Sequence, residues 1–101
     1  MKYVRTERAR HGYTRLRDDA KDHFKEAVRL MNDAYDQRGD ERIPIWPRQL
    51  RIKSVEGARG IWEMTWNWPD GRATFEYTDL GDEGAAILWR RIGGHEIFRD
   101  P

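Results

Sequence analysis

The feature that most constrains this chain is an alternation of apolar and polar side chains over residues 61–68. Every second position holds a large apolar side chain: Trp62, Met64, Trp66 and Trp68. Because successive side chains of a β-strand point to opposite faces of a sheet, the pattern predicts a strand with two unlike faces. Pro69-Asp70-Gly71 supplies turn chemistry, and the alternation resumes over residues 73–77. We therefore predict a β-hairpin in which most of the tryptophans serve the core.

A third run of strand-forming residues covers 85–92 and ends at Gly93-Gly94-His95. Two glycines free the backbone next to the only histidine in this half of the chain. An imidazole titrates near neutral pH, so His95 is a candidate for proton transfer. The residues alone leave two other interpretations open, a solvated loop histidine or a structural hydrogen-bond donor.

Length and composition point to one folded domain over residues 1–101. Charged residues make up 37% of the chain, but 12% aromatic residues with five tryptophans argue against disorder. We expect no membrane span, because no apolar run approaches ~18 residues. The absence of cysteine excludes disulfides and thiolate metal sites, and it favours a cytoplasmic protein.

The net charge is only +1, but the charges are arranged in blocks. Residues 1–17 and 42–60 are basic, whereas residues 18–41 and 61–84 are acidic. Such an arrangement allows a basic face and an acidic face on one molecule. A uniformly solvated surface is the plainer interpretation.

Two helices are predicted before the hairpin. Thr6 is a suitable N-cap for a short helix that extends to about Leu16, after a first strand at residues 3–5. A longer helix begins at Asp18 and ends near Gly39. Its apolar face is expected to hold Ala20, Phe24, Ala27, Val28, Met31, Ala34 and Tyr35.

Residues 42–48 should form a connector, because Pro44 and Pro47 prevent a regular helix. We expect its apolar side chains to contact the core; they are Ile43, Ile45 and Trp46. Alternation over residues 49–53 predicts a further strand that is apolar on one side and basic on the other. The expected order is strand, helix, helix and then three antiparallel strands, with the helices on one face of the sheet and the other face open.

Cationic side chains near the hairpin are candidates for phosphate binding, because guanidinium groups can grip phosphate oxygens bidentately. They are Arg51, Lys53, Arg72, Arg90 and Arg91. Neighbouring strand residues point to opposite faces, so we expect only one of Arg90 and Arg91 in any one groove. Phe98 is the aromatic side chain best placed to contact a ligand. His11 and His23 should be surface residues, and the scattered histidines predict no metal site.

Three of these segments resemble the RelE/ParE superfamily of toxin–antitoxin toxins, in its RelE/YafQ-like branch. They are Gly60-Ile61-Trp62-Glu63, Arg72-Ala73-Thr74-Phe75, and Arg91-Ile92-Gly93-Gly94-His95 with Phe98. The resemblance covers nearly the whole chain. It implies an α+β fold in which two N-terminal helices pack on a small antiparallel sheet, in the order β-α-α-β-β-β.

The resemblance also implies an activity, the ribosome-dependent cleavage of messenger RNA without a metal or another cofactor. In that case His95 handles a proton, while Arg91 and Arg72 stabilise the phosphate. Lys53, Arg51, Arg90 and Phe98 would contact the RNA. The implied partners are a cognate antitoxin, the ribosome and mRNA, with assembly into a higher-order toxin–antitoxin complex.

Two alternatives remain open at this stage. Relatives that poison DNA gyrase share the fold and are not nucleases, so the chain is alternatively a ParE-like toxin. It is otherwise a non-toxic interaction module with the same fold.

Overall fold

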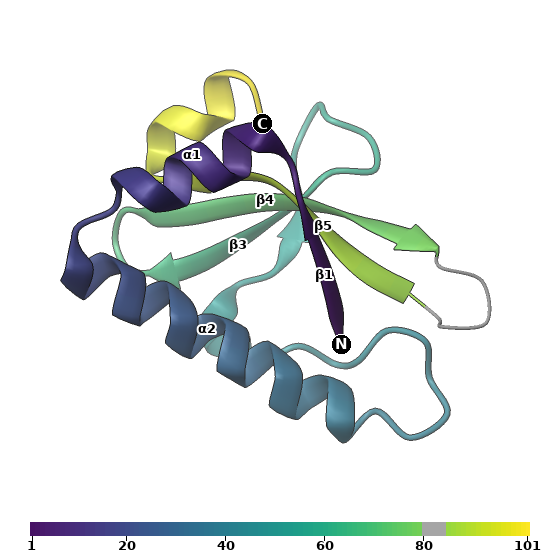
Figure 1. Cartoon of the computed structure of the whole chain (residues 1–101). Coiled ribbons are helices and arrows are strands. Elements are labelled where there is room, and N and C mark those ends of the chain that lie inside the picture. The colour runs from purple at the N-terminus through teal and green to yellow at the C-terminus, as the bar shows by residue number, and fades with distance from the viewer. Residues whose placement is uncertain (80–84) are drawn as a thin grey trace.

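The computed structural model describes residues 1–79 and 85–101 of the chain. The described elements, in order, are β1 (Lys2–Arg5), α1 (Glu7–Arg15), α2 (Asp18–Asp36), the 3₁₀ helix η1 (Arg48–Leu50), β2 (Lys53–Ser54), β3 (Trp62–Asn67), β4 (Gly71–Asp79), β5 (Ala85–Gly93) and the 3₁₀ helix η3 (His95–Arg99) (Figure 1). Asp82 and Glu83, which belong to the last acidic block, lie outside the described residues.

The two predicted helices are confirmed. The Thr6 side chain accepts a hydrogen bond from the Ala9 backbone N–H, as an N-cap should, and α1 begins at the next residue. Helix α2 turns its apolar face to the sheet and buries Phe24, Ala27 and Met31. Helix α1 approaches β5 so closely that a Cβ on Gly12 would lie 2.1 Å from the carbonyl oxygen of Ile92. Glycine at this position therefore allows the contact.

The strands form one sheet in the order β1-β5-β4-β3-β2. The predicted hairpin is confirmed, since β3 and β4 pair antiparallel across the turn at residues 68–70. The prediction of a wholly antiparallel sheet with three strands after the helices is wrong in detail, because four strands follow them and β1 pairs with β5 in parallel. No tight turn joins β1 to β5, so local sequence does not set their relative direction. Thr6 continues the pairing by donating its N–H to the Trp89 carbonyl at 3.0 Å.

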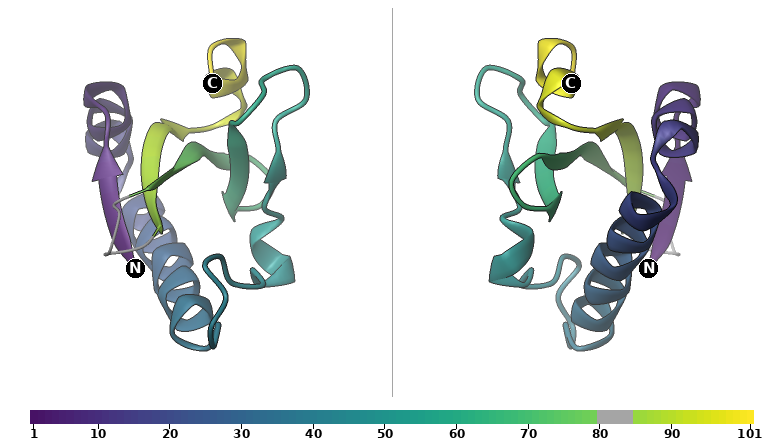
Figure 2. Two further views of the ribbon diagram at one scale, coloured as in Figure 1. Left: turned by 90° about the vertical axis from the view of Figure 1, so that its right-hand side faces the viewer. Right: turned by 90° about the vertical axis from the view of Figure 1, so that its left-hand side faces the viewer.

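The core lies between the sheet and the two helices. Met64, Phe75 and Ile87 are fully buried there, and the ring of Phe24 meets the rings of Trp66 and Trp89 edge to face. The predicted alternation holds through Trp66. It fails at Trp68, which is 62% exposed, because the pairing of β3 with β4 shifts between Thr65 and Asn67. Figure 2 shows both helices on the same side of the sheet.

The connector between α2 and the sheet differs from the prediction. Ile43 is 42% exposed and Ile45 is 97% exposed, whereas Trp46 packs against the core and donates a hydrogen bond to the Tyr77 hydroxyl at 2.9 Å. Pro44 is buried, and in this proline-restricted loop its neighbour Ile45 faces outward.

The predicted strand over residues 49–53 is also shorter than expected. Residues 48–50 form η1, and Arg51 follows in the left-handed region with φ of 46°. Pairing with β3 is therefore limited to Lys53 and Ser54.

The face opposite the helices is partly covered. Helix η3 lies against β4 and β5, and its Ile97 is 1% exposed. The expected open face is thus confined to the part of the sheet that η3 leaves free, near β2, β3 and the start of β4. Within the described residues, no helix combines the length and the apolar composition that crossing a membrane requires.

Candidate active site

A cleft with a volume of about 650 Å³ opens on this free part of the sheet. Its walls come from β2, β3, β4, η3 and the loops beside them. The lining residues are Arg51, Ile52, Lys53, Glu63, Thr65, Trp68, Arg72, His95 and Phe98. Cationic, acidic and aromatic side chains therefore meet here around one imidazole.

The imidazole of His95 is held by a carboxylate from the hairpin turn. The ring Nδ1 lies 2.7 Å from Oδ1 of Asp70, and the His95 backbone N–H donates to the same oxygen at 3.2 Å. The hydrogen bond to the His95 ring lowers the pKa of the Asp70 carboxyl most, and the bond from the His95 backbone N–H lowers it further. Together they hold this pKa below its usual range. Because Nδ1 faces Asp70, Nε2 is the ring nitrogen left to act on a ligand.

Gly94 has a steric role beside this contact. A Cβ on Gly94 would lie 2.5 Å from Oδ2 of Asp70 and 2.7 Å from Oε2 of Glu96. Only a residue without a side chain lets the turn carboxylate come this close to the start of η3. Gly94 thus permits the Asp70–His95 contact.

Arg72 is nearly buried, with 6% of its surface exposed. One guanidinium nitrogen donates to the Gly71 carbonyl at 3.0 Å, and the guanidinium carbon lies 5.4 Å from the centre of the Trp68 ring. The guanidinium of Arg51 lies over the same ring at 4.2 Å. Trp68 therefore orders two cations beside the cleft while it remains largely exposed.

Glu63 supplies the carboxylate of the cleft. Its side chain is 17% exposed, and its Oε1 lies 4.0 Å from the ammonium of Lys53, whose side chain is 71% exposed. The Phe98 ring centre lies 6.2 Å from that of His95. The cleft thus holds two groups capable of proton transfer, several cations and aromatic rings on which a base can stack.

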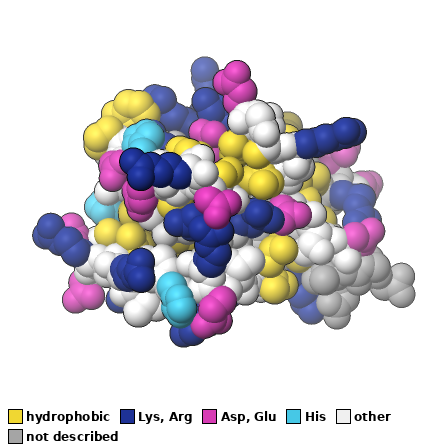
Figure 3. Space-filling view, turned by 90° about the horizontal axis from the view of Figure 1, so that it is seen from above, with side chains coloured by type: hydrophobic (Ala, Val, Ile, Leu, Met, Phe, Trp, Pro, Cys, Tyr) yellow, Lys and Arg dark blue, Asp and Glu magenta, His cyan; other side chains and the backbone are white. Residues whose placement is uncertain are grey.

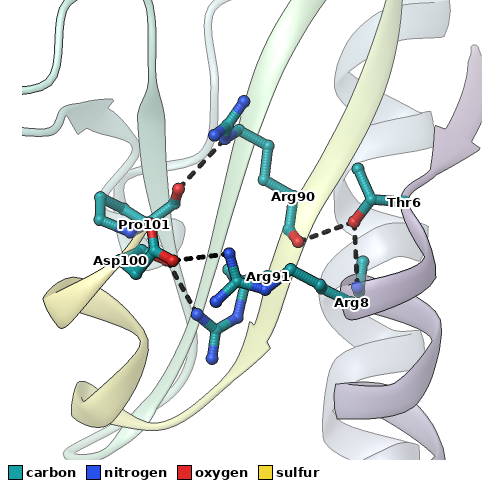
Figure 4. A network of polar contacts seen from close by, with 7 residues as sticks. Thr6, Arg8, Arg90, Arg91, Asp100 and Pro101 are labelled. Atoms are coloured by element: carbon teal, nitrogen blue, oxygen red, sulfur yellow. Dashed lines mark hydrogen bonds and ion pairs between the residues drawn. The ribbon is translucent and has the colours of Figure 1, made fainter.

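The structure gathers most of the candidate residues in this cleft and leaves two elsewhere. His95, Arg72, Arg51, Lys53 and Phe98 all line it. By contrast, Arg91 donates to the Asp100 carbonyl at 2.8 Å and Arg90 to the Pro101 carbonyl at 3.2 Å (Figure 4). Arg90 also donates to the Glu76 carboxylate at 2.5 Å.

The expectation that Arg90 and Arg91 leave opposite faces is wrong. The pairing of β4 with β5 passes from Arg91 opposite Thr74 to Trp89 opposite Phe75, so Arg90 is the extra residue of a β-bulge. Strict alternation fails at a bulge, and both arginines reach the same short segment, Asp100–Pro101.

Sequence reasoning missed Asp70, Glu63 and Trp68 as parts of the site. Asp70 had been assigned only to the turn, and Trp68 only to the core. Glu63 carried a signal, since it is the polar residue of the alternating strand beside the Gly60-Ile61-Trp62 segment. Of the histidines, His11 and His23 are exposed on the helices, as predicted.

Solved structures show which fold this is. The YafQ chain of the Escherichia coli DinJ-YafQ toxin–antitoxin complex superposes with a TM-score of 0.65 at 13% identity, over 93% of this chain and 91% of that one. The chain has a RelE/YafQ-like toxin fold. The RelB-RelE antitoxin–toxin complex of Methanococcus jannaschii gives 0.59 at 10% identity, over 96% and 95% of the two chains.

A mutant of Escherichia coli RelE in complex with an antitoxin RelBc peptide is also similar, with a TM-score of 0.56 at 13% identity, over 98% of this chain and 90% of that one. No protein-family model matches the sequence, and no curated protein matches it. The likeness to RelE and YafQ therefore lies in the fold, which spans almost the whole chain.

The described residues gather no group of three or more histidine and carboxylate side chains suited to a metal ion.

Proposed function

We propose that this protein is the toxin of a toxin–antitoxin system and that it cleaves messenger RNA on the ribosome. The observation that carries the proposal is the cleft itself, in which an imidazole oriented by Asp70 lies in the same 650 Å³ space as Glu63 and the nearly buried Arg72. The RelE/YafQ-like fold supports it.

RNA brings its own nucleophile, so the cleft has to move protons and stabilise charge. A base takes the proton of a 2′-hydroxyl, the oxygen attacks the adjacent phosphorus, and the bond to the 5′-oxygen breaks as that oxygen receives a proton. The products are a 2′,3′-cyclic phosphate and a 5′-hydroxyl. Glu63 is our candidate base and His95, acting through Nε2, our candidate acid.

Arg72 is our candidate for stabilising the pentacoordinate phosphorane. A nearly buried guanidinium is fixed before the reaction and acts in a medium of lower dielectric constant than water. Arg51 and Lys53 would bind flanking phosphates, while Trp68 and Phe98 would stack on unpaired bases. Arg91, which the resemblance assigned to the phosphate, has no part in this scheme.

The proposed partners follow from the same scheme. The similar YafQ and RelE structures are complexes with antitoxins, and we propose a cognate antitoxin for this chain as well. The toxin would act in the cytoplasm, where mRNA is translated. An antitoxin that covers the cleft would keep the toxin inactive.

The test is expression in bacteria, followed by mapping of RNA ends. We expect the wild-type protein to stop growth and to produce new mRNA ends, and His95→Ala to abolish both. His23→Ala is the matched control, because His23 is an exposed histidine on α2. Full toxicity of His95→Ala at equal protein level would contradict the assignment, and DNA breaks with intact mRNA would favour the gyrase alternative.

A further inference from the structure

The cluster in Figure 4 stands outside the cleft and has no role in the proposed chemistry. Two cationic side chains, Arg8 of α1 and Arg91 of β5, converge on Asp100, where Arg8 binds the carboxylate at 2.8 Å and Arg91 binds the carbonyl at 2.8 Å. Arg90 binds the carbonyl of the next residue, Pro101, at 3.2 Å. Three guanidinium groups, one from α1 and two from consecutive residues of β5, are thus held by the oxygens of two consecutive residues.

We propose that Arg8, Arg90 and Arg91 form a second phosphate-binding site for single-stranded RNA, which the Asp100–Pro101 segment occupies in the free protein. The carboxylate and carbonyl oxygens stand where phosphate oxygens would bind. Guanidinium groups suit both kinds of acceptor. RNA has to displace the segment to reach the site. This inference rests on the proposed function for the identity of its ligand.

The first support is the surroundings of the cluster. A groove of about 730 Å³ runs between α1 and the end of β5, and basic residues line it from the helix side: Arg8, His11, Arg15 and Arg17. Arg91 lines it from β5. Figure 3, seen from above, shows Lys and Arg side chains gathered in the middle of this surface, interspersed with fewer acidic ones.

The second support is continuity with the candidate active site. Asp70 lines the groove, and its partner His95 lines the cleft. The groove and the cleft therefore meet at the Asp70–His95 contact. A single-stranded RNA that places its reacting phosphate at His95 can continue past the Asp70–His95 contact toward Arg91.

The third support is that the segment is held weakly enough to be displaced. The Arg8 and Asp100 side chains are 54% and 70% exposed, and exposed ion pairs contribute little in water. Acidic side chains near the site reduce its positive charge, and each of them has a basic or backbone partner or lies in the groove wall. Glu76 pairs with Arg90, Asp70 and Glu96 line the groove, and Glu96 is tied to the Gly94 backbone N–H at 3.0 Å.

Binding of an uncleavable probe tests the proposal with the full chain. The probe is a short single-stranded RNA with every 2′-hydroxyl methylated, and its affinity is measured by fluorescence anisotropy. We expect Asp100→Asn to bind about two- to fivefold more tightly than wild type, because the variant releases Arg8 from an exposed ion pair. Asp36→Asn removes an equal charge at the far end of α2 and should change the affinity less than twofold.

A double variant makes the test specific to the cluster. Adding Arg8→Ala to Asp100→Asn should cancel the gain, because the released cation is then absent. Equal affinities for Asp100→Asn and Asp36→Asn would overturn the proposal. The proposal would also be overturned if Asp100→Asn bound a polyglutamate peptide more tightly than wild type but did not bind the RNA probe more tightly. The site would then take an acidic protein segment.

The affinity measurement does not depend on cleavage. If the protein cleaves no RNA but Asp100→Asn still binds the probe more tightly than wild type, the second site is supported and the proposed function is not. A chain that cleaves RNA without showing the gain retains the function and loses the second site.

Discussion

The two faces of β3 and β4 have opposite properties, although the same strands build them. On the helix side, Met64 and Phe75 are fully buried among aromatic rings. On the other side, the alternate positions carry Glu63, Thr65 and Arg72, which line a cleft. The period of two in a β-strand thus lets adjacent residues serve stability and chemistry separately. Substitutions on one face should then change mainly the free energy of unfolding, and those on the other mainly the activity.

The largest expected effect is on the helix side. Phe75→Ala removes a fully buried ring that meets Trp89 and Tyr77 edge to face, and we expect it to lower the free energy of unfolding by about 3–5 kcal/mol. Urea denaturation measures this value. Glu63→Gln, on the other face of the neighbouring strand, should lower it far less. Similar losses for the two variants would break the division between the faces.

Next in size is the effect of Arg72 on cleavage. Arg72→Ala should slow RNA cleavage about 10²- to 10³-fold, because it removes a preorganised guanidinium that stabilises developing charge. Single-turnover cleavage on programmed ribosomes gives the rate. Arg5→Ala is the control, since Arg5 is exposed on β1, at the opposite edge of the sheet from β2. Near-normal cleavage by a folded Arg72→Ala protein would remove Arg72 from the mechanism.

Trp68 tests whether the exposed end of the hairpin belongs to the site. We expect Trp68→Ala to weaken RNA binding by about 1–3 kcal/mol, because one stacked base is lost and Arg51 loses the ring it lies over. Trp68→Phe should recover part of the loss. If alanine and phenylalanine variants bind RNA as tightly as wild type, the exposed ring is no part of the interface.

The smallest effect is the pH dependence of stability at Asp70. The folded-state pKa of this carboxyl is lowered, so its contact with His95 stabilises the fold above the ordinary pKa of 3.8 and is lost as the pH falls through the lower folded value. Both side chains are exposed, so the contribution is at most about 1 kcal/mol. The unfolding free energies of wild type and Asp70→Asn should differ at pH 6 and converge at acidic pH. A constant difference across that range would contradict the assigned contact.

Local pattern predicted the hairpin, both helices and the Thr6 N-cap of α1, because each depends on residues close in sequence. Pairing between segments that are distant in the sequence was harder to predict. The parallel contact of β1 with β5 leaves no local signature, and the two bulges arise where strands pair. Those bulges move Trp68 to the cleft and turn Arg90 and Arg91 toward Asp100.

The candidate site could be predicted only in part from the sequence. The residue types of His95 and Arg72 indicated phosphate chemistry, and the fold brings both side chains to one cleft. Asp70 was recognisable only as a turn residue, because its contact with His95 spans 25 positions and depends on the placement of η3. Physical proximity across the sheet, rather than residue type, identifies it.

The central claim is that the cleft cleaves RNA by using the 2′-hydroxyl beside the broken bond. The most direct measurement uses purified protein and ribosomes programmed with mRNA that carries one 2′-deoxynucleotide at a mapped cleavage position. Cleavage should disappear at that position alone, and the unmodified mRNA should yield a 2′,3′-cyclic phosphate end. Continued cutting at the deoxynucleotide would contradict the proposed chemistry.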